Sequence, residues 1–447
     1  MKIGQPVKFL YNILLYFLIA IGFPVILPLA LFSEKRRKTI LQRLGLVPLS
    51  AGMIRRCSLL SEEKIVWVHA LSVGEVLSAV PLVKRLKESS HTINIVFSVS
   101  TKTGFDIANQ YLNDSVIGIF YFPYDLNFSV KHVAEKIAPA VVVIVETDIW
   151  PNFLFEMKKR HTPVVLVNVN ARLSNKSFMG YKRFDFFAKP LFLSFANICT
   201  QSVEDARRFQ TLGVPSDRMM VTGNIKFDQE FQFLSAEEVE DLRKWMQIEP
   251  SQKVLVAGST HKGEESILLD AFSKMKSEFK DLLLVVIPRD PERAKSVYRI
   301  FQTAGFSVRL MKEMEKISEG HRFDVIVVGI LGILKKLYAI ADIAFIGGSL
   351  IACGGHNPLE PALFAKPIIF GQDMSDFKEI SKFLVDSGGA VSVHDSASLF
   401  EASAILIRDE KKAIEAGESA HQVFKANKGA VDKTLGVVET CLEAISK

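Results

Sequence analysis

The chain has 447 residues, which is too long for one ordinary hydrophobic core and predicts two domains of roughly 200 residues each. Its composition is globular, with 49% hydrophobic and 23% charged residues, and it contains no prominent low-complexity tract. The formal net charge of +6 is mildly basic. That charge suits an anionic partner such as a phosphorylated substrate or an acidic membrane surface, but it is no signature of nucleic-acid binding.

The spacing of the cysteines disfavours a disulfide framework and a zinc site. The four of them are widely separated, and none belongs to a CxxC pair or a Cys/His cluster. A chain with this cysteine usage fits a reducing compartment.

The N-terminus is expected to be a membrane anchor. Residues 9–32 carry no charge and are long enough to span a bilayer. A cleaved signal peptide is the alternative, but no small-x-small cleavage site follows. Pro24 and Pro28 leave open a kinked or partly interfacial helix. Five basic residues between positions 35 and 43 follow the apolar run, which predicts that the body lies in the cytoplasm.

Short apolar runs alternate with helical patterns along the rest of the chain. Continuous runs rich in β-branched residues are typical of parallel strands buried on both faces. The runs lie at 65–69, 93–100, 141–146, 163–168 and 196–201, and again at 253–259, 281–288, 323–328, 342–348 and 366–371. The pattern predicts an α/β fold with two Rossmann-like domains facing a cleft. We expect an anchor at 1–33, one domain at 34–230, a linker at 231–252 and a second domain at 253–447.

In the first domain, three charged residues stand at predicted strand ends, where open parallel sheets bind their ligands. Glu75 follows the first strand in the stretch SVGE, Glu146 follows a buried run, and Lys226 lies in GNIKFD. A carboxylate there could deprotonate an acceptor hydroxyl, and a cation could offset charge on a leaving group. Each residue alone is more often a helix cap or a surface charge. Their shared position favours function.

In the second domain, GSTHKGEE (258–265) resembles a phosphate loop only in its glycine spacing. Glu264 and Glu265 stand where that motif needs Lys and Ser or Thr, which disfavours an NTPase. No GxGxxG follows the first strand, which disfavours a dehydrogenase. Ser259, Thr260 and nearby backbone N–H groups could accept one phosphate, or they could form an ordinary N-cap.

The stretch GGHNPLEPA (354–362) predicts a helix start that faces an anion or a sugar, where Glu360 could bind both hydroxyls of a ribose. His356 is more simply a loop histidine. Arg289, after a buried strand, could bind a phosphate or base, or form a surface salt bridge with Asp290 or Glu292. The chain has neither a DxD triplet nor a helical histidine pair, so no metal is expected.

Taken together, these motifs resemble the 3-deoxy-D-manno-octulosonic acid (Kdo) transferases of lipopolysaccharide synthesis. The resemblance covers the whole chain and includes HALSVGE, TKTG, ETDIWPN, NARLS, YKRF, TGNIKFD, GSTHKGEE, PRDPER, LYAIADIAFIGGSL and GGHNPLEPA. It implies a GT-B fold and inverting, metal-independent transfer of Kdo. The donor would be CMP-Kdo, and the acceptor a lipid A precursor at the cytoplasmic face of the cell inner membrane. No further cofactor is implied.

The resemblance also implies site residues. Glu75 corresponds to the general base, and Glu146 and Lys226 to stabilisers of the transition state. The implied CMP contacts are Pro288, Arg289, Gly332, Ile333, Leu334, Asn357, Pro358, Leu359 and Glu360.

The sequence departs from the family pattern at three places in its second half. Asp290 stands where the family has His. In GILGIL (329–334), Gly329 and Ile333 occupy acidic positions, and Gly371-Gln372-Asp373 replaces a Gly-Pro-His stretch.

Two other classes of function stay open on the sequence. One is another GT-B enzyme, such as a nucleotide-sugar epimerase or a lipid-linked sugar transferase. The other is a non-catalytic lipid-binding membrane protein, which would not need Glu75, Arg289 and Glu360 together.

Overall fold

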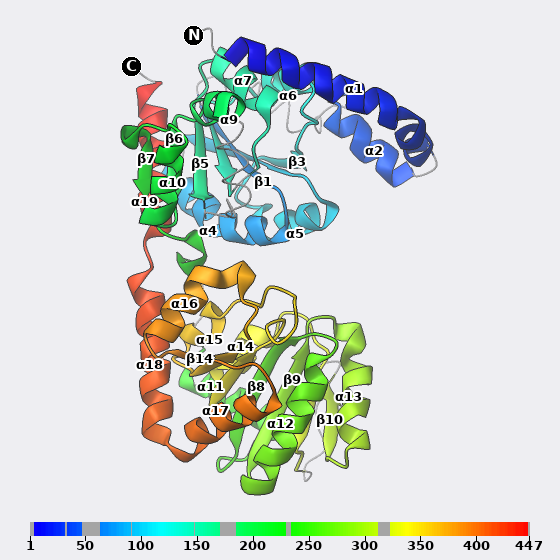
Figure 1. Ribbon diagram of the computed structural model, residues 1–447, viewed down its shortest axis with the longest axis vertical. Helices are drawn as coiled ribbons and strands as arrows, with labels where there is room; N and C mark the ends of the chain where they lie inside the picture. The colour runs from blue at the N-terminus through cyan, green and yellow to red at the C-terminus, as the bar shows by residue number, and fades with distance from the viewer. Residues whose placement is uncertain are drawn as a thin grey trace. The chain divides into compact units, whose positions relative to one another are not determined.

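The computed structural model describes residues 4–31, 34–46, 63–90, 92–146, 148–169, 185–228, 234–311 and 322–445. The chain forms two compact units (Figure 1). Unit 1 comprises Met1–Glu230 together with Asn427–Lys447, and unit 2 comprises Phe231–Ala426.

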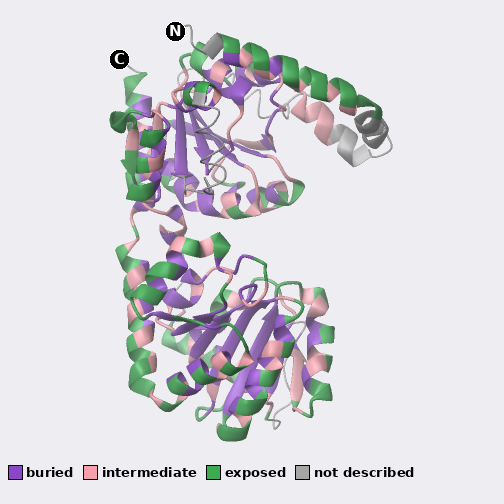
Figure 2. Ribbon diagram, viewed as in Figure 1, coloured by how far each residue is buried: buried purple, intermediate pink, exposed green. Residues whose placement is uncertain are grey.

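Unit 1 is built on a parallel seven-stranded sheet in the order β3-β2-β1-β4-β5-β6-β7. The strands are β1 (Lys64–Ala70), β2 (Ile93–Val99), β3 (Gly118–Tyr121), β4 (Val141–Val145), β5 (Val164–Val169), β6 (Asn197–Thr200) and β7 (Met219–Val221). Figure 2 shows the central strands buried along their length, as their continuous apolar sequences predict.

Unit 1 contains nine described α-helices, several of which cover the two faces of this sheet. They are α1 (Gly4–Leu31), α2 (Glu34–Arg43), α4 (Val73–Ser89), α5 (Lys102–Leu112), α6 (Asn127–Ile137), α7 (Pro151–Lys159), α9 (Asp185–Phe192), α10 (Val203–Thr211) and α19 (Ala430–Ala444), with 3-10 turns η1 (Ser216–Arg218) and η2 (Ile225–Asp228). One core lies under α6, α7, α9 and α10, and the other lies under α4, α5 and α19.

The end of the chain belongs to unit 1, and the predicted second domain of 253–447 is wrong in this respect. Helix α19 packs on α4, β4 and β5, and Ala430, Val431 and Val438 lie in the core beneath it. The carboxylate of Asp228 accepts hydrogen bonds from the backbone N–H groups of Gly429 (2.7 Å) and Val431 (2.6 Å). The apolar face of an amphipathic helix does not indicate which sheet it covers.

Unit 2 contains a second parallel seven-stranded sheet, in the order β10-β11-β9-β8-β12-β13-β14. Its strands are β8 (Lys253–Thr260), β9 (Leu282–Pro288), β10 (Val308–Met311), β11 (Val325–Val328), β12 (Ile343–Ile346), β13 (Ile368–Phe370) and β14 (Ala390–Ser392). Two Rossmann-like units therefore confirm the predicted fold class.

The helices of unit 2 begin inside the stretch predicted to be a linker. They are α11 (Ala236–Trp245), α12 (Glu264–Glu278), α13 (Ala294–Thr303), α14 (Leu334–Ala339), α15 (Leu359–Leu363), α16 (Lys378–Asp386), α17 (Ser396–Arg408) and α18 (Glu410–Ala426), with 3-10 turns η3 (Pro291–Arg293) and η4 (Ser375–Phe377). A capping box of Ser235 and Glu238 starts α11. Arg243 then donates hydrogen bonds to the carbonyls of Ile340 and Gln252, so much of the 231–252 stretch is part of unit 2.

Each sheet has a point where the chain reverses its direction of winding. In unit 1 this point lies between β1 and β4, and in unit 2 it lies between β8 and β12. Loops that leave neighbouring strands on opposite sides of the sheet open a crevice there, and α/β proteins bind ligands in it. The predicted site residues of each unit are therefore expected to lie near the reversal point of its sheet.

Helix α1 packs on other helices of unit 1. It contacts α7 and α9, and Val7 and Asn12 are buried on its packed side. The Asn12 amide donates to the side-chain oxygen of Asn152 (2.8 Å) and accepts from the amides of Asn152 (2.9 Å) and Asn127 (3.0 Å). Its stretch Pro6–Pro24 is long and apolar enough to cross a membrane, judged by length and composition only.

Candidate functional site

Glu75 lies in the first turn of α4, directly after β1. Its Oε2 atom accepts a hydrogen bond of 2.5 Å from the backbone N–H of Leu71. Burial raises the pKa of this carboxyl from 4.5 to about 7, with a further contribution from the negative charge of Glu146 and a smaller one from Asp148. The backbone N–H groups of Leu71 and Ser72 oppose the increase. A carboxyl whose pKa lies close to neutral pH is suited to take up a proton.

Glu146 and Lys226, both predicted from strand ends, are brought together. Glu146 follows β4 and is buried, and its Oε1 atom lies 3.5 Å from Nζ of Lys226 on η2. Glu146 has a φ of 65°, an uncommon backbone conformation for a residue with a side chain that is often retained at functional sites. The Glu146–Lys226 pair thus places a cation among the carboxylates at the carboxyl ends of the strands of unit 1.

A network of amide side chains holds the turn that carries Lys226. Asn168, at the end of β5, accepts from the backbone N–H of Ile225 (3.1 Å). Gln201 donates to the carbonyl of Asn168 (2.9 Å) and accepts from the amide of Asn224 (3.0 Å). Asn224 in turn accepts from the backbone N–H of Lys226 (3.0 Å). The position of Lys226 therefore depends on residues from three strand ends.

A buried His–Asp pair lies at the same carboxyl ends of the strands. Sequence reasoning did not single it out. His69, fully buried on β1, lies with Nε2 2.7 Å from Oδ2 of Asp148. Its Nδ1 is 2.9 Å from Oγ of Ser98, and its ring stacks on Phe122 with 3.9 Å between ring centroids. The one signal in the sequence was a histidine inside an otherwise apolar strand.

Arg43 was counted among the basic residues that flank the membrane anchor, yet it packs on this side of unit 1. Its Nε donates to the carbonyl of Phe122 (2.9 Å), and its guanidinium lies 4.2 Å from the ring centroid of Tyr124. Burial lowers its pKa, and the charge of Asp148 is among the opposing influences. Arg43 therefore supplies positive charge near the His69–Asp148 pair.

In unit 2, Glu264 fills the place where a phosphate loop would bind an anion. Its Oε2 accepts from the backbone N–H groups of His261 (2.9 Å) and Gly348 (2.7 Å), and its Oε1 accepts from those of Ser349 and Leu350 (both 3.0 Å). The side chain is fully buried. A built-in carboxylate thus occupies the backbone donors of this loop.

Glu265 and Thr260 also have partners inside the protein. The Thr260 hydroxyl donates to Oε1 of Glu265 (3.0 Å), and Arg293 pairs with the same carboxylate at 2.9 Å. The Thr260 hydroxyl and the backbone donors of this loop are therefore bound to carboxylates of the protein itself.

Arg289, His261, His356 and Glu360 gather near the reversal point of unit 2. The Nε2 atoms of His261 and His356 lie 2.8 Å apart. The pKa of His356 is lowered to about 4, first by burial and then by the charges of Arg289 and His261. Burial raises the pKa of Glu360, which Lys335 and Arg289 oppose. Arg289 is exposed, and no described residue pairs with it, so the predicted salt-bridge alternative is wrong.

The remaining predicted CMP contacts serve local structure as well. The Asn357 side chain accepts from the backbone N–H of Leu359 (3.1 Å) at the start of α15, and Pro358 precedes that helix. Leu334 lies against Gly258 of β8, close to where Pro288 ends β9. Gly332 and Ile333 instead line a hollow of about 480 Å³ with Trp245 and Lys336.

The departures from the family pattern have structural partners. Asp290 accepts from the backbone N–H of Glu292 (3.0 Å) and begins η3. A Cβ atom at Gly329 would lie 2.9 Å from that of Ala294, which leaves no room for an acidic side chain. Asp373 accepts from Gly354 (2.8 Å) and therefore holds the loop that carries His356. Gln372 is exposed.

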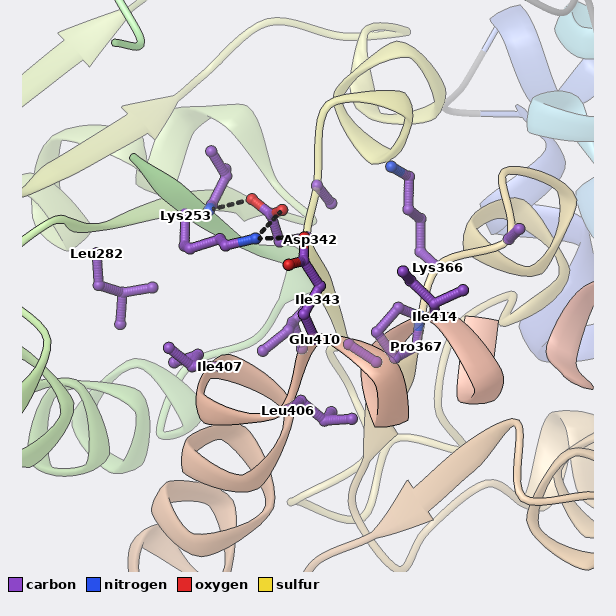
Figure 3. A pocket seen from close by; sticks show the side chains of 14 residues that line it. Lys253, Leu282, Asp342, Ile343, Lys366, Pro367, Leu406, Ile407, Glu410 and Ile414 are labelled. Carbon is purple, nitrogen blue, oxygen red and sulfur yellow. Dashed lines mark hydrogen bonds and ion pairs between the residues drawn. The ribbon is translucent and has the colours of Figure 1, made fainter. Parts of the chain in front are cut away.

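Another hollow in unit 2, of about 140 Å³, lies away from this chemistry. It is bordered by the starts of β8, β9 and β12. The predicted site lies at the other ends of these strands. Figure 3 shows Lys253 paired there with Asp342 and Glu410, each at 3.6 Å. In the part of the chain that the structure describes, no three His, Cys, Asp or Glu residues are grouped to hold a metal ion.

The matching family and two similar proteins carry the name of one enzyme, 3-deoxy-D-manno-octulosonic acid transferase. Residues 38–229 match the family described as 3-deoxy-D-manno-octulosonic-acid transferase (kdotransferase). The chain is 33% identical to 3-deoxy-D-manno-octulosonic acid transferase of Haemophilus influenzae over 380 residues, covering 85% of this chain and 87% of that protein. It is 30% identical to the Aquifex aeolicus enzyme of the same name, covering 80% and 90%.

Among solved structures, the UDP-GlcNAc 2-epimerase of Neisseria meningitidis is similar in fold. The TM-score is 0.57, the identity is 16%, and the match covers 85% of this chain and 100% of that one. At this identity the likeness concerns the fold alone.

Proposed function

This chain belongs to the 3-deoxy-D-manno-octulosonic acid (Kdo) transferase family of GT-B glycosyltransferases, and we propose that it transfers Kdo from CMP-Kdo to a hydroxyl of a lipid A precursor with inversion at the anomeric carbon. The observation that carries the mechanism is Glu75, a partly exposed carboxyl whose pKa is raised to about 7 beside Glu146 and Asp148. The cleft between the two domains stays a prediction.

Glu75 is the proposed general base. The acceptor hydroxyl is a poor nucleophile until its proton is removed, and a single displacement needs that removal on the face opposite the departing CMP. The raised pKa supports this role, because a base whose pKa lies near the working pH accepts a proton effectively while a useful fraction of it stays ionised. The Leu71 N–H bond to Oε2 fixes the direction of the carboxylate.

Lys226 and Glu146 are the proposed stabilisers of the transition state. The Kdo carbon gains positive character as its bond to CMP lengthens, and the leaving phosphate gains negative charge. A carboxylate and an ammonium held 3.5 Å apart offer one charge for each. Their separation is maintained by the Asn168–Gln201–Asn224 network, so neither group has to reorganise during the reaction.

The donor is proposed to bind unit 2. Arg289 has no ion-pair partner among the described residues and lies at the end of β9, where nucleotide-binding sheets receive phosphate groups. We propose that Glu360 and Asn357 contact the ribose and base side of CMP. The proposal needs neither a metal nor a further cofactor, because the charged groups are all side chains of the protein.

We further propose that the enzyme acts at the cytoplasmic face of the cell inner membrane and that α1 lies along the membrane surface rather than crossing it. The helix contacts α7 and α9 of unit 1, and Asn12 is tied to that body by hydrogen bonds. Its other side is exposed and apolar, with Phe9, Leu10, Ile13, Leu14, Phe17, Leu18 and Ile21. Such a helix suits partial burial in one leaflet.

The decisive experiment is incubation of the full chain with CMP-Kdo and a tetraacylated disaccharide acceptor, with and without EDTA. We expect the acceptor mass to increase by one or more Kdo units, the number of which is left to the measurement, and EDTA to have no effect. Conversion of a nucleotide sugar without any lipid would support the epimerase alternative. Lipid binding without turnover would support a non-catalytic protein.

A further inference from the structure

We propose that His261 and His356 form a proton-accepting clamp for the phosphate of the nucleotide. Before binding, the two Nε2 atoms share one proton in a hydrogen bond. When the phosphate arrives, this bond opens, one proton is taken from solvent, and each Nε2–H donates to a phosphate oxygen. The inference rests on the proposed function, because it assigns new residues to the same donor.

The first support is the position of the pair. His261 directly follows β8, and His356 lies in the loop after β12, so the two residues flank the reversal point of the unit 2 sheet. Their rings are nearly parallel, with 12° between planes and 5.1 Å between centroids. Both side chains are only half-buried, so a ligand beside this reversal point can reach them.

The second support is that the backbone donors of this crevice are already used. Four N–H groups, including those of Gly348 and Ser349, donate to the buried carboxylate of Glu264. Glycine-rich loops commonly bind phosphate through such groups, but here they are occupied by the protein itself. We therefore expect an anion to be bound by side chains. The cationic or protonatable ones here include Lys262 beside His261 and Lys335 near Glu360, and those whose charges act on His356 are Arg289 and His261.

The third support is the charge balance around His356. A hydrogen bond between two Nε2 atoms requires one of them to be unprotonated. Arg289 helps keep His356 in that state, since its positive charge is among the causes that lower the pKa of His356. A phosphate bound to Arg289 would neutralise that charge and add a negative one beside the imidazoles. Both changes favour uptake of a proton.

The other charged groups at this edge do not replace the clamp. Glu264 is saturated by backbone N–H groups, and Glu265 is paired with Arg293. Asp373 accepts from Gly354, and burial raises the pKa of Glu360. None of these carboxylates can donate to a phosphate when ionised. The histidine pair gains a donor when it takes up a proton, whereas these carboxylates only accept hydrogen bonds in their ionised form.

The test is calorimetric titration of the unmodified full chain with CMP, in two buffers whose ionisation enthalpies differ, at about pH 7.5, where the CMP phosphate is already mostly dianionic. The expected result is a buffer-dependent binding enthalpy that corresponds to uptake of about one proton per CMP. An enthalpy equal in both buffers would overturn the proposal. This measurement needs no variant and so does not depend on how substitutions affect folding.

Variants then assign the proton. His356→Gln and His261→Gln should each weaken CMP binding roughly tenfold and abolish the proton uptake, while cytidine, which lacks the phosphate, should bind as before. His394→Gln, an exposed histidine of the same unit, is the matched control and should change neither quantity. Melting temperatures report whether each variant folds. If both variants keep the CMP affinity of the native chain, the His261–His356 hydrogen bond has only a structural role and the proposal is wrong.

Failure of the clamp and failure of the proposed function are distinguishable. An unmodified chain that binds CMP without proton uptake, and still transfers Kdo, contradicts the clamp alone. A chain that neither binds CMP nor transfers Kdo contradicts the donor assignment itself.

Discussion

The two units carry the same short pattern at the same topological position, and the chemistry of the two places differs. In both, the helix that follows the first strand of the sheet starts near a Gly-Glu pair: Gly74-Glu75 at α4 and Gly263-Glu264 at α12. Glu75 is partly exposed and close to Glu146 and Asp148, and its pKa is raised to about 7. Glu264 is fully buried and accepts four backbone N–H bonds.

The difference distinguishes a carboxylate saturated by backbone donors from the one that is proposed as the general base. Four charge-assisted hydrogen bonds stabilise an ionised carboxylate and use its lone pairs, so Glu264 has no capacity left for a substrate. Glu75 is partly buried, lies near other negative charges and accepts fewer such bonds, so its ionised form is less favourable and its pKa is raised. The local sequence is alike, and the two carboxylates differ in the charges around them and in the number of backbone donors that they accept from.

The largest expected effect comes from Glu75→Gln. The substitution keeps the shape and removes the basicity, so turnover should fall by roughly 10²–10⁴-fold, while CMP affinity changes little. Turnover, CMP affinity and melting temperature are to be measured on one preparation. A variant with near-normal turnover would make Glu75 a helix-start residue like Glu264 and would remove the contrast between the two units.

The next effect concerns stability and comes from Glu264→Gln. The amide oxygen of Gln can accept from two of the four N–H groups, and its NH₂ group would face the other two. Each buried donor left without a partner costs about 1–3 kcal/mol, so unit 2 should lose roughly 2–6 kcal/mol of its free energy of unfolding. Hydrogen exchange at residues 348–350 reports the loss directly. Unchanged protection of these amides would contradict the structural role of Glu264.

A smaller effect follows from the pKa of Glu75. Below about pH 4.5 this carboxyl is protonated in both the folded and the unfolded chain, and between 4.5 and about 7 only the folded chain retains the proton. The stability contributed by Glu75 is therefore present at low pH and is lost as the pH rises through about 7. Relative to the native chain, Glu75→Gln should gain about 1–3 kcal/mol by pH 8.

Denaturant unfolding of both proteins across this pH range measures the gain. A stability difference that does not vary with pH would show that the Glu75 pKa is not raised in the folded protein.

The sequence predicted the two sheets well and the assignment of helices to them less well. Strands buried on both faces are continuous apolar runs, which local sequence displays directly. Helix α19 shows an equally clear apolar face, but that face carries no information about whether it covers β4 and β5 or the sheet of unit 2. Only the three-dimensional structure shows that it returns to unit 1.

For the site, too, features visible in the local sequence were predicted, and contacts between distant residues were not. Glu146 and Lys226 could be singled out because strand ends are visible in the sequence, and the structure places them 3.5 Å apart. His69 was missed because a histidine inside an apolar strand resembles an ordinary core residue. The role of Glu264 was hidden because its partner Gly348 lies 84 positions away. Long-range hydrogen bonds leave no local pattern.

The smallest effects should come from the glycines that precede the two carboxylates. Gly263 has a φ of 106°, which an L-residue adopts only with strain, so Gly263→Ala should cost about 1–2 kcal/mol. Gly74 lies inside α4 without a positive φ, and a Cβ atom there would meet nothing within 4 Å. Gly74→Ala should therefore be neutral or gain up to about 1 kcal/mol. Equal effects on denaturant unfolding would contradict the backbone difference between the two helix starts. If Gly74→Ala is stable and Kdo transfer nevertheless falls, the open space above Gly74 is occupied by the substrate during turnover, which would strengthen the assignment of Glu75 as the base beside it.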